Sequence, residues 1–115
     1  MTRSLSLAAA LVVAAFVLCG HAQAACGLAS WYGKESGNRT ASGAYFDGSQ
    51  ILVAHKSYPF GTRLKITYNG RSVIAPVLDR GPFIKGRELD LSYAAAKRIG
   101  LIRPGVARVC WEKVR

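Results

Sequence analysis

The sequence predicts a small, mainly β fold with one short helix, and three observations lead to this prediction. Residues 62–68 alternate apolar and polar side chains, which is typical of a half-buried strand. Asn69-Gly70 follows at once, and residues 71–78 can return as a second strand. Asn-Gly between two such runs predicts a hairpin, because both central residues of a type I′ turn need positive φ. A convincing helix composition occurs only over residues 93–99.

The beginning of the chain has the features of an export signal. The basic residue Arg3 precedes an almost wholly apolar stretch over residues 5–20. Residues 22–24, Ala-Gln-Ala, have the small-x-small pattern after which a signal peptidase cuts. We therefore expect a signal peptide over residues 1–24 and a single exported domain over residues 25–115.

This stretch raises two possibilities of membrane attachment, a span and a lipid anchor. It is shorter than the roughly 20 residues that a bilayer span prefers, so we expect no stable membrane span. Cys19 raises the alternative of a lipid anchor. However, the large residues Phe16 and Leu18 stand where a lipoprotein signal carries a Leu-like and a small residue. Cleavage without lipidation is favoured, and the expected location is the periplasm or cell envelope.

The mature chain has two cysteines, Cys26 near its start and Cys110 near its end. In an oxidising compartment one intramolecular pairing is possible, and we predict the Cys26–Cys110 disulfide. Two free thiols or an intermolecular bridge are the alternatives. A domain of this size buries only a modest core, so a covalent link between distant segments would help to stabilise it.

The chain is strongly basic. Its formal net charge of +10 falls to +9 when Arg3 leaves with the signal peptide. Basic proteins often bind nucleic acid through Lys and Arg contacts to phosphates. Export argues against nucleic acid as a partner, and the basic residues are spread along the chain rather than clustered. An anionic wall polymer or membrane surface fits better, and part of the charge is simply solvated surface.

Short strands separated by turns account for most of the mature chain. Residues 27–32 predict a first strand that ends in aromatic side chains. Residues 33–43 are polar and Gly-rich and predict a loop, the kind of segment on which ligands are commonly held. Residues 51–55 are a second apolar run, and residues 106–111 predict a last strand that carries Cys110.

The helix has sequence signals at both ends. Asp90-Leu91-Ser92 offers N-cap oxygens, and Gly100 can close the helix in the left-handed conformation. We expect its apolar residues to pack on the sheet.

Asp79 and Arg80 stand at the end of the predicted return strand, directly before the turn residues Gly81-Pro82. A side chain at the rim of a rigid sheet can be aimed at a ligand better than one on a mobile loop. The alternative is that Asp79 only accepts hydrogen bonds from nearby backbone amides, as in an Asx-turn.

Successive motifs of this chain resemble those of the rare lipoprotein A (RlpA) family, in the same order. The matching blocks are residues 27–33 (GLASWYG), 40–43 (TASG), 46–47 (FD), 54–56 (AHK), 59–62 (PFGT), 79–83 (DRGPF) and 90–92 (DLS). The resemblance implies a small six-stranded double-psi β-barrel that meets peptidoglycan in the bacterial envelope.

The resemblance also implies an activity, the lytic cleavage of peptidoglycan between N-acetylmuramic acid and N-acetylglucosamine, preferably in peptide-stripped strands. By position, the family's catalytic Asp falls on Asp79 and its active-site His on His55. Its catalytic Glu would stand at position 44, which is Ala44 here. The nearby carboxylates Glu35 and Asp47 are not at the expected position.

One carboxyl group can be enough for this reaction. Glycoside hydrolases typically need two, whereas in lytic transglycosylation the 6-hydroxyl of muramic acid attacks the anomeric carbon and leaves an anhydro end. Asp79 could act first as acid and then as base, provided burial raises its pKa above the usual value of about 3.9. The alternative is a non-catalytic, expansin-like module that binds peptidoglycan or another polysaccharide and has lost catalysis with the Glu at Ala44.

Four further residues are predicted to bind substrate: Tyr32, Thr40, Ser42 and Arg80. Tyr32 can stack on a sugar ring, and the hydroxyls of Thr40 and Ser42 can bond sugar hydroxyls or merely shape their loop. His55 lies in an apolar run and could equally be a packed, hydrogen-bonded side chain.

We expect no metal site, since the mature chain has a single histidine and two cysteines far apart in sequence. No cofactor is expected either. The predicted partner is the peptidoglycan glycan strand, and we expect the protein to be a monomer.

Overall fold

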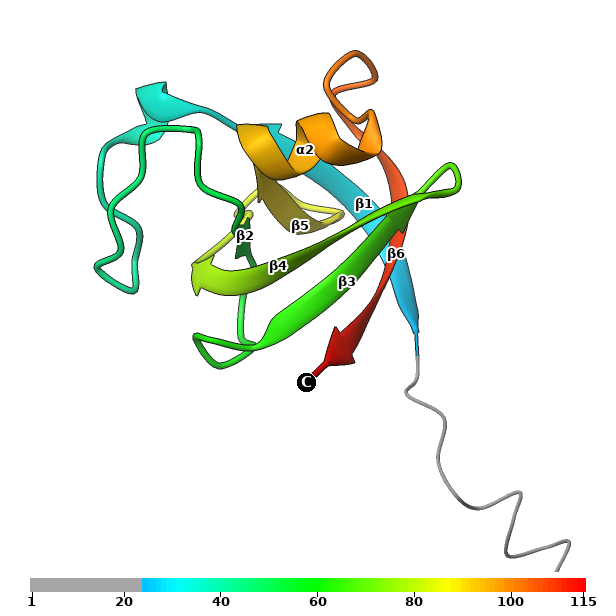
Figure 1. The fold of residues 1–115 in the computed structure, drawn as a ribbon, viewed down its shortest axis with the longest axis horizontal. Helices are drawn as coiled ribbons and strands as arrows, with labels where there is room; N and C mark the ends of the chain where they lie inside the picture. The colour runs from blue at the N-terminus through cyan, green and yellow to red at the C-terminus, as the bar shows by residue number, and fades with distance from the viewer. Residues whose placement is uncertain (1–23) are drawn as a thin grey trace, which may run out of the picture.

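The computed structural model describes residues 24–115, which form a closed six-stranded β-barrel with one α-helix against it (Figure 1). Around the barrel the strands follow the order β1-β5-β2-β4-β3-β6. Their bounds are β1 Ala25–Tyr32, β2 Val53–Ala54, β3 Arg63–Tyr68, β4 Arg71–Asp79, β5 Arg87–Ser92 and β6 Ala107–Val114. A 3₁₀ turn, η1, spans Lys34–Ser36, and the helix, α2, spans Tyr93–Ile99. The mainly β fold with one short helix is confirmed.

The barrel contains both parallel and antiparallel pairings, and they bring distant segments together. β1 pairs in parallel with β5 and antiparallel with β6, so the first and last strands are neighbours. β2 lies between β4, to which it is parallel, and β5, to which it is antiparallel (Figure 1). This short central strand therefore joins the ends of β4 and β5 on one side of the barrel.

The predicted hairpin is confirmed as β3 and β4, which pair antiparallel from Arg63–Pro76 to Tyr68–Arg71. Asn69 and Gly70 connect them with φ of 51° and 81°, the left-handed values that this turn requires.

The inward faces of the strands form one apolar core that α2 helps to cover. α2 contacts β1, β4 and β5, and its residues Ala95, Ala96 and Ile99 are buried. The predicted caps are present: the Ser92 hydroxyl accepts a hydrogen bond from Ala95 N, and Gly100 ends the helix in the left-handed region. The largest fully buried core side chains on the strands are Val53, Leu64, Ile66, Val77, Leu89, Leu91 and Val109.

Two elements differ from the sequence-based prediction. Residues 87–92 form β5, whereas the sequence analysis treated 90–92 only as a helix cap; Leu89 and Leu91 alternate inward there. The apolar run 51–55 pairs as a strand only over Val53–Ala54, because the amides beside it bond elsewhere. Leu52 N donates to the Ser92 hydroxyl, for example.

Cys26 and Cys110 are register partners on β1 and β6 and are joined by the predicted disulfide. The two cysteines are 84 residues apart in sequence. The disulfide lies at the seam of the barrel, where the first strand, β1, pairs with the last, β6.

The expected signal peptide and the question of Cys19 fall outside the described residues, apart from Ala24. Among residues 24–115, no helix has the length and apolar character that a membrane crossing would need.

Candidate active site

Asp79 is the last residue of β4 and lies at the mouth of the barrel, as the Gly81-Pro82 turn predicts. The register between β2 and β4 shifts here: Val53 pairs with Val77, but the next residue, Ala54, pairs with Asp79. A shift of this kind locally twists a strand and re-aims its side chains. The shift therefore places Asp79 level with Ala54 rather than one position beyond it.

The Asp79 carboxylate accepts three hydrogen bonds. Oδ1 accepts from the backbone amides of Ala41 at 2.8 Å and Arg80 at 2.9 Å, and Oδ2 accepts from the Tyr32 hydroxyl at 3.0 Å. Only the Arg80 amide belongs to the local turn; the other two donors come from elsewhere in the chain. Three donors suit the carboxylate form, which can only accept. The network holds the carboxylate in one orientation at the rim.

A second carboxylate, Asp90 on β5, lies opposite Asp79. Ala54 is the register partner of both residues, one on each side of β2. Two strand spacings separate their backbones by about 10 Å, and the methyl group of Ala54 is the only side chain between them in the register.

The environment of Asp90 differs from that of Asp79. Burial is the main cause that raises the pKa of Asp90; the hydrogen bond from Ser30 and the charge of Arg87 oppose the rise, the charge of Asp79 adds to it, and the resulting pKa is about 6. The Ser30 hydroxyl donates to Asp90 Oδ1 at 3.0 Å. Near neutral pH, Asp90 therefore keeps a usable population of the protonated form, as a general acid must.

The charges of both carboxylates act on the pKa of the Tyr32 hydroxyl. Burial, the charge and hydrogen bond of Asp79, and the charge of Asp90 raise its pKa. Its hydroxyl thus stays protonated and donates to Asp79, and its ring packs on Phe46, with centroids 5.0 Å apart. The side chain predicted to stack on a sugar is engaged in orienting Asp79.

Arg80 turns its guanidinium away from Asp79. Its Nη1 donates to the carbonyls of Tyr58 at 2.8 Å and His55 at 3.3 Å, and its Cζ lies 3.9 Å from the centroid of the Phe60 ring. The cation therefore braces the segment after β2. Its hydrogen bond to Asp79 comes from the backbone amide.

His55 is buried beside this segment. Its Nδ1 accepts from the amides of Ser57 at 3.0 Å and Tyr58 at 2.9 Å, and its ring stacks on that of Tyr58 at 3.6 Å. Burial lowers its pKa, and the charge of Arg80 adds to this effect, while Glu88 opposes it. A neutral ring with Nδ1 accepting carries its proton on Nε2. The backbone amide of His55 donates to the Asp79 carbonyl at 3.2 Å, so this residue also positions the end of β4.

The loop that contains Thr40 and Ser42 closes over the end of β4. Ser42 N donates to the Leu78 carbonyl at 3.1 Å, beside the bond from Ala41 to Asp79. The Thr40 and Ser42 hydroxyls bond each other at 2.9 Å, and Thr40 N donates to the Ala44 carbonyl at 3.0 Å. Ser42 is exposed and Thr40 is buried. Ala41 and Ser42 thus attach the loop to the end of β4, and Ala44 is held within the loop by its bond to Thr40.

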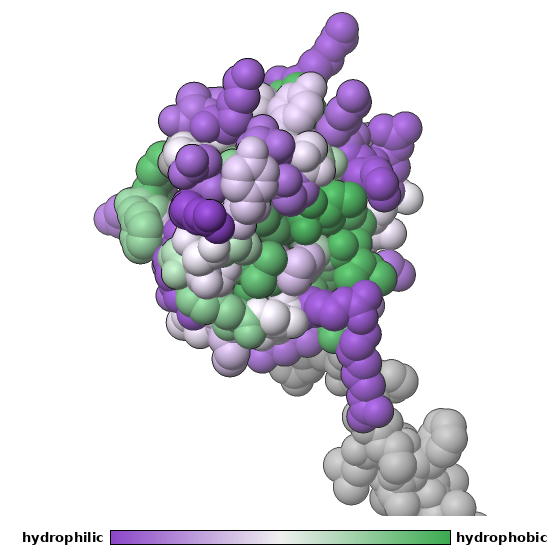
Figure 2. Space-filling model, turned by 60° about the vertical axis from the view of Figure 1, so that its left-hand side comes forward, coloured by the Kyte–Doolittle hydropathy of each residue, from purple (hydrophilic) through white to green (hydrophobic). Residues whose placement is uncertain are grey.

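The face that carries this loop has a mixed surface. Figure 2 shows apolar side chains gathered in patches among strongly polar ones on this side of the molecule. Near the site, Tyr45, Phe60 and Phe83 are exposed, with Phe83 the most exposed at 84%. Flat apolar rings beside carboxylates are a surface on which sugar rings can lie.

Asp90 and Ser30 were not predicted from the sequence as site residues. From the sequence, Asp90 is only a helix-cap residue and part of the DLS motif. The alternation of Leu89 and Leu91 in residues 87–92 is the signal that could have identified a strand and placed Asp90 on the face opposite to these core residues.

The remaining carboxylates lie elsewhere. Glu35 accepts from Gly33 N at 3.2 Å, and Asp47 accepts from the amide and hydroxyl of Ser49. Within residues 24–115, no group of three or more His, Cys, Asp and Glu side chains is arranged to hold a metal ion.

The closed six-stranded barrel with its crossing parallel connections is a double-psi β-barrel. A family model described as "Lytic transglycolase" matches residues 24–111. A protein of Aquifex aeolicus named "Probable endolytic peptidoglycan transglycosylase RlpA" is 55% identical over 83 residues, which are 70% of this chain and 37% of that protein. The Vibrio cholerae "Endolytic peptidoglycan transglycosylase RlpA" is 46% identical over 91 residues, 76% of this chain and 35% of that protein. The chain belongs to the RlpA family of lytic transglycolases, and it spans little more than a third of these two relatives.

Solved structures show the same barrel. The Streptomyces papain inhibitor superposes with a TM-score of 0.68 at 29% identity, over 81% of this chain and 96% of that one. Expansin of Clavibacter michiganensis superposes with a TM-score of 0.65 at 25% identity, over 81% of this chain and 51% of that one.

Proposed function

We propose that this domain is an endolytic peptidoglycan transglycosylase that cleaves glycan strands between N-acetylmuramic acid and N-acetylglucosamine and leaves anhydro-muramic ends. The observation that carries the proposal is the pair of carboxylates, Asp79 and Asp90, that flank Ala54 in different environments. Membership of the RlpA family supports the same reaction and substrate.

In the proposed reaction Asp90 is the acid. Its carboxyl donates a proton to the glycosidic oxygen as the bond from that oxygen to the anomeric carbon of the muramic acid breaks. A carboxyl whose surroundings raise its pKa is a common choice for the catalytic acid. Asp90, with a pKa of about 6, can donate a proton near neutral pH.

Asp79 is the proposed base. It accepts the proton of the muramic acid 6-hydroxyl as that oxygen attacks the anomeric carbon and closes the anhydro ring. The attack is intramolecular, which gives it a large proximity advantage over attack by water. Tyr32 and the amides of Ala41 and Arg80 hold Asp79 for this role.

This division of roles explains how the chain could act with Ala44 in place of the family's Glu. The sequence analysis considered Asp79 as the sole acid and base, and that prediction stays open. The neighbouring Asp90 supplies a second carboxyl from β5. His55 and Arg80, predicted as a catalytic and a binding residue, are proposed here to position Asp79 through the segment after β2, and Thr40 and Ser42 to shape the loop over it.

A non-catalytic wall-binding module is the second candidate. Ala44 favours it, since one acid/base group of the family is missing, and so does the likeness to expansin. It would use the exposed aromatic rings near Asp79 to bind a polysaccharide without turnover.

The proposed location is the bacterial envelope, after export and removal of residues 1–24. This follows from the export signal and from a peptidoglycan substrate. Residues 25–115 are proposed to act as a monomeric domain.

The test is mass spectrometry of peptidoglycan products, with strands both intact and stripped of stem peptides. The mature wild-type domain should release anhydro-muramic products, and Asp79→Asn and Asp90→Asn should each release far less. If none of the three proteins cuts but all co-sediment with the glycan, the second candidate is correct. Reducing-end products without anhydro rings would instead indicate hydrolysis by water.

A further inference from the structure

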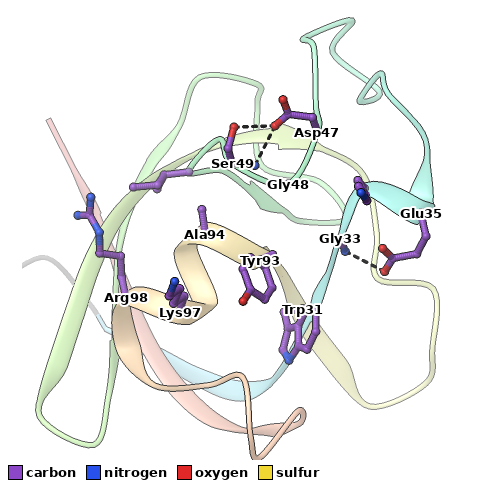
Figure 3. A pocket seen from close by; sticks show the side chains of 12 residues that line it. Trp31, Gly33, Glu35, Asp47, Gly48, Ser49, Tyr93, Ala94, Lys97 and Arg98 are labelled. Atoms are coloured by element: carbon purple, nitrogen blue, oxygen red, sulfur yellow. Dashed lines mark hydrogen bonds between the residues drawn. The ribbon is translucent and has the colours of Figure 1, made fainter.

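A cleft of about 890 Å³ lies apart from the two carboxylates, between α2, η1 and the segment before β2 (Figure 3). In Figure 3, Tyr93, Ala94 and Lys97 of α2 project into its middle, with Asp47 to Ser49 along one side and Trp31 to Glu35 along another. Neither Asp79 nor Asp90 lines it. The cleft therefore belongs to a different surface from the candidate active site.

The walls of the cleft are fixed by hydrogen bonds before any ligand arrives. Ala94 N donates to the Gly48 carbonyl at 3.2 Å, which ties the segment before β2 to the start of α2. Asp47 holds its own turn by accepting from Ser49 N at 3.0 Å and Ser49 Oγ at 2.6 Å. A preformed site loses less conformational entropy on binding than a mobile one.

Two aromatic rings supply an apolar surface in the cleft. Trp31 and Tyr93 meet edge to face, with ring centroids 5.4 Å apart and planes at 67°. Trp31 Nε1 donates to the Ile102 carbonyl at 3.2 Å, which fixes the orientation of the indole. Tyr93 is 39% exposed. Such rings suit the C–H faces of a sugar or the aliphatic part of a peptide.

Three cations line the same cleft: Lys34, Lys97 and Arg98. Within the part of the chain that the structure describes, no side-chain hydrogen bond or ion pair engages any of them. The two acids of the lining, Glu35 and Asp47, already accept hydrogen bonds from their own turns. Lys97 and Arg98 project from the last turn of α2, where they are available to an anionic group.

We propose that this cleft is a second binding site, which takes a carboxylate-bearing fragment of peptidoglycan. The carboxylate would meet Lys97 and Arg98, and the body of the ligand would lie on Trp31 and Tyr93. The choice of polymer rests on the proposed function. Two parts of peptidoglycan carry this chemistry, the lactyl group of muramic acid and the stem peptide, and the experiment below distinguishes them.

Trp31 of the cleft stands in β1 between Ser30 and Tyr32, which bond Asp90 and Asp79, so a polymer held in the cleft would lie close to both carboxylates. A second contact on the same polymer makes the catalytic encounter effectively intramolecular, which raises the local concentration of substrate without any new contact at the carboxylates. The cleft would therefore affect the concentration of glycan at half-maximal rate more than the rate at saturation.

The chain contains a built-in reporter for the test. Its two tryptophans, Trp31 and Trp111, differ in position: Trp31 lines the cleft, whereas Trp111 is buried in the barrel core. We would titrate the mature protein with a soluble N-acetylmuramyl peptide and with a peptide-free disaccharide of N-acetylglucosamine and N-acetylmuramic acid. Trp31 fluorescence should change saturably with at least one of them, and calorimetry should give the same Kd.

Matched variants locate the binding. Lys97→Gln/Arg98→Gln should weaken binding roughly tenfold through loss of two charge-assisted contacts. Lys65→Gln/Arg108→Gln removes the same charge from exposed positions on β3 and β6 and should leave the Kd within about twofold. The fluorescence change should vanish in Trp31→Phe while the thermal transition is retained.

Several outcomes would overturn the proposal. One is that both double variants weaken ligand binding equally; another is that the fluorescence change persists in Trp31→Phe. A third is that inorganic phosphate, or the same ligand with its carboxylates amidated, binds the wild type as tightly as the ligand does. The response to the two ligands decides between lactyl and peptide carboxylates.

Failure of the proposed function is separate: in that case no anhydro products form, yet Trp31 still reports binding. If anhydro products form and neither ligand binds the cleft, only the cleft proposal fails.

Discussion

Asp90→Asn should abolish cleavage and at the same time stabilise the fold near neutral pH. The variant keeps an oxygen that can accept the hydrogen bond from Ser30, which is 3.0 Å long in the wild type. It removes the charge that burial penalises. An acid held in a partly buried position for catalysis costs stability, and the neutral amide removes that cost.

The magnitude follows from the pKa of Asp90, which rises from 3.8 to about 6 in the folded state. At 1.36 kcal/mol per pH unit this is about 3 kcal/mol, and partial exposure of the side chain reduces it to about 1–2 kcal/mol. The folded state binds this proton more tightly than the unfolded chain, so the free energy of unfolding of the wild type falls as pH rises from about 4 to about 6. The gain in unfolding free energy from Asp90→Asn is therefore absent below pH 4 and complete above pH 6.

Denaturant unfolding at pH 3.5 and pH 7.5 checks this prediction. Asp47→Asn is the control: hydrogen bonds from Ser49 lower the pKa of Asp47, so its substitution should destabilise at pH 7.5, with the opposite sign. An Asp90→Asn protein that is less stable than the wild type at pH 7.5, or equally more stable at both pH values, would refute the view that Asp90 is held with a raised pKa.

Three further predictions concern the site and the disulfide. Asp79→Asn should reduce anhydro-product formation by at least about 100-fold with an unchanged circular dichroism spectrum; unchanged turnover would exclude Asp79 as a catalytic group. Ala44→Glu should raise the cleavage rate, because it returns the carboxyl that the family resemblance implies to the loop whose Ala41 amide bonds Asp79; a folded but no faster variant would show that the site differs from that of the family at more than one position. Reduction of Cys26–Cys110 should cost up to about 4.5 kcal/mol on the chain-entropy model for a separation of 84 residues. Differential scanning calorimetry with and without reductant measures this, and an unchanged Tm would mean that the link does not stabilise the fold.

The parts of the fold that depend on neighbouring residues were predictable from sequence. Asn69-Gly70 requires left-handed backbone and the flanking runs alternate, so the hairpin could be placed to within a residue. The same local logic placed Asp79 at the end of a strand, because Gly81-Pro82 cannot continue one. It also placed both caps of the helix.

The role proposed for Asp90 could not be predicted in this way. β5 is six residues long, and its partner β1 is some 60 residues away in sequence, so no local turn marks the pairing. The raised pKa of Asp90 arises from burial and from the charge of Asp79 across β2, and neither can be seen in a sequence. The cleft was missed for a similar reason, since it exists only where α2 meets the segment before β2.

The seam between β1 and β6 has a consequence for how the chain acquires its structure. β1 holds Ser30 and Tyr32, which bond the two carboxylates, but both of its neighbours, β5 and β6, lie in the last third of the chain. A chain that emerges N-terminus first, from a ribosome or a translocation channel, cannot pair β1 with β5 until residue 92 is free, and cannot close the barrel until β6 is free. Contacts this distant in sequence also make folding slow. A truncated chain that lacks β6 would leave β1 with an unpaired edge beside Ser30 and Tyr32.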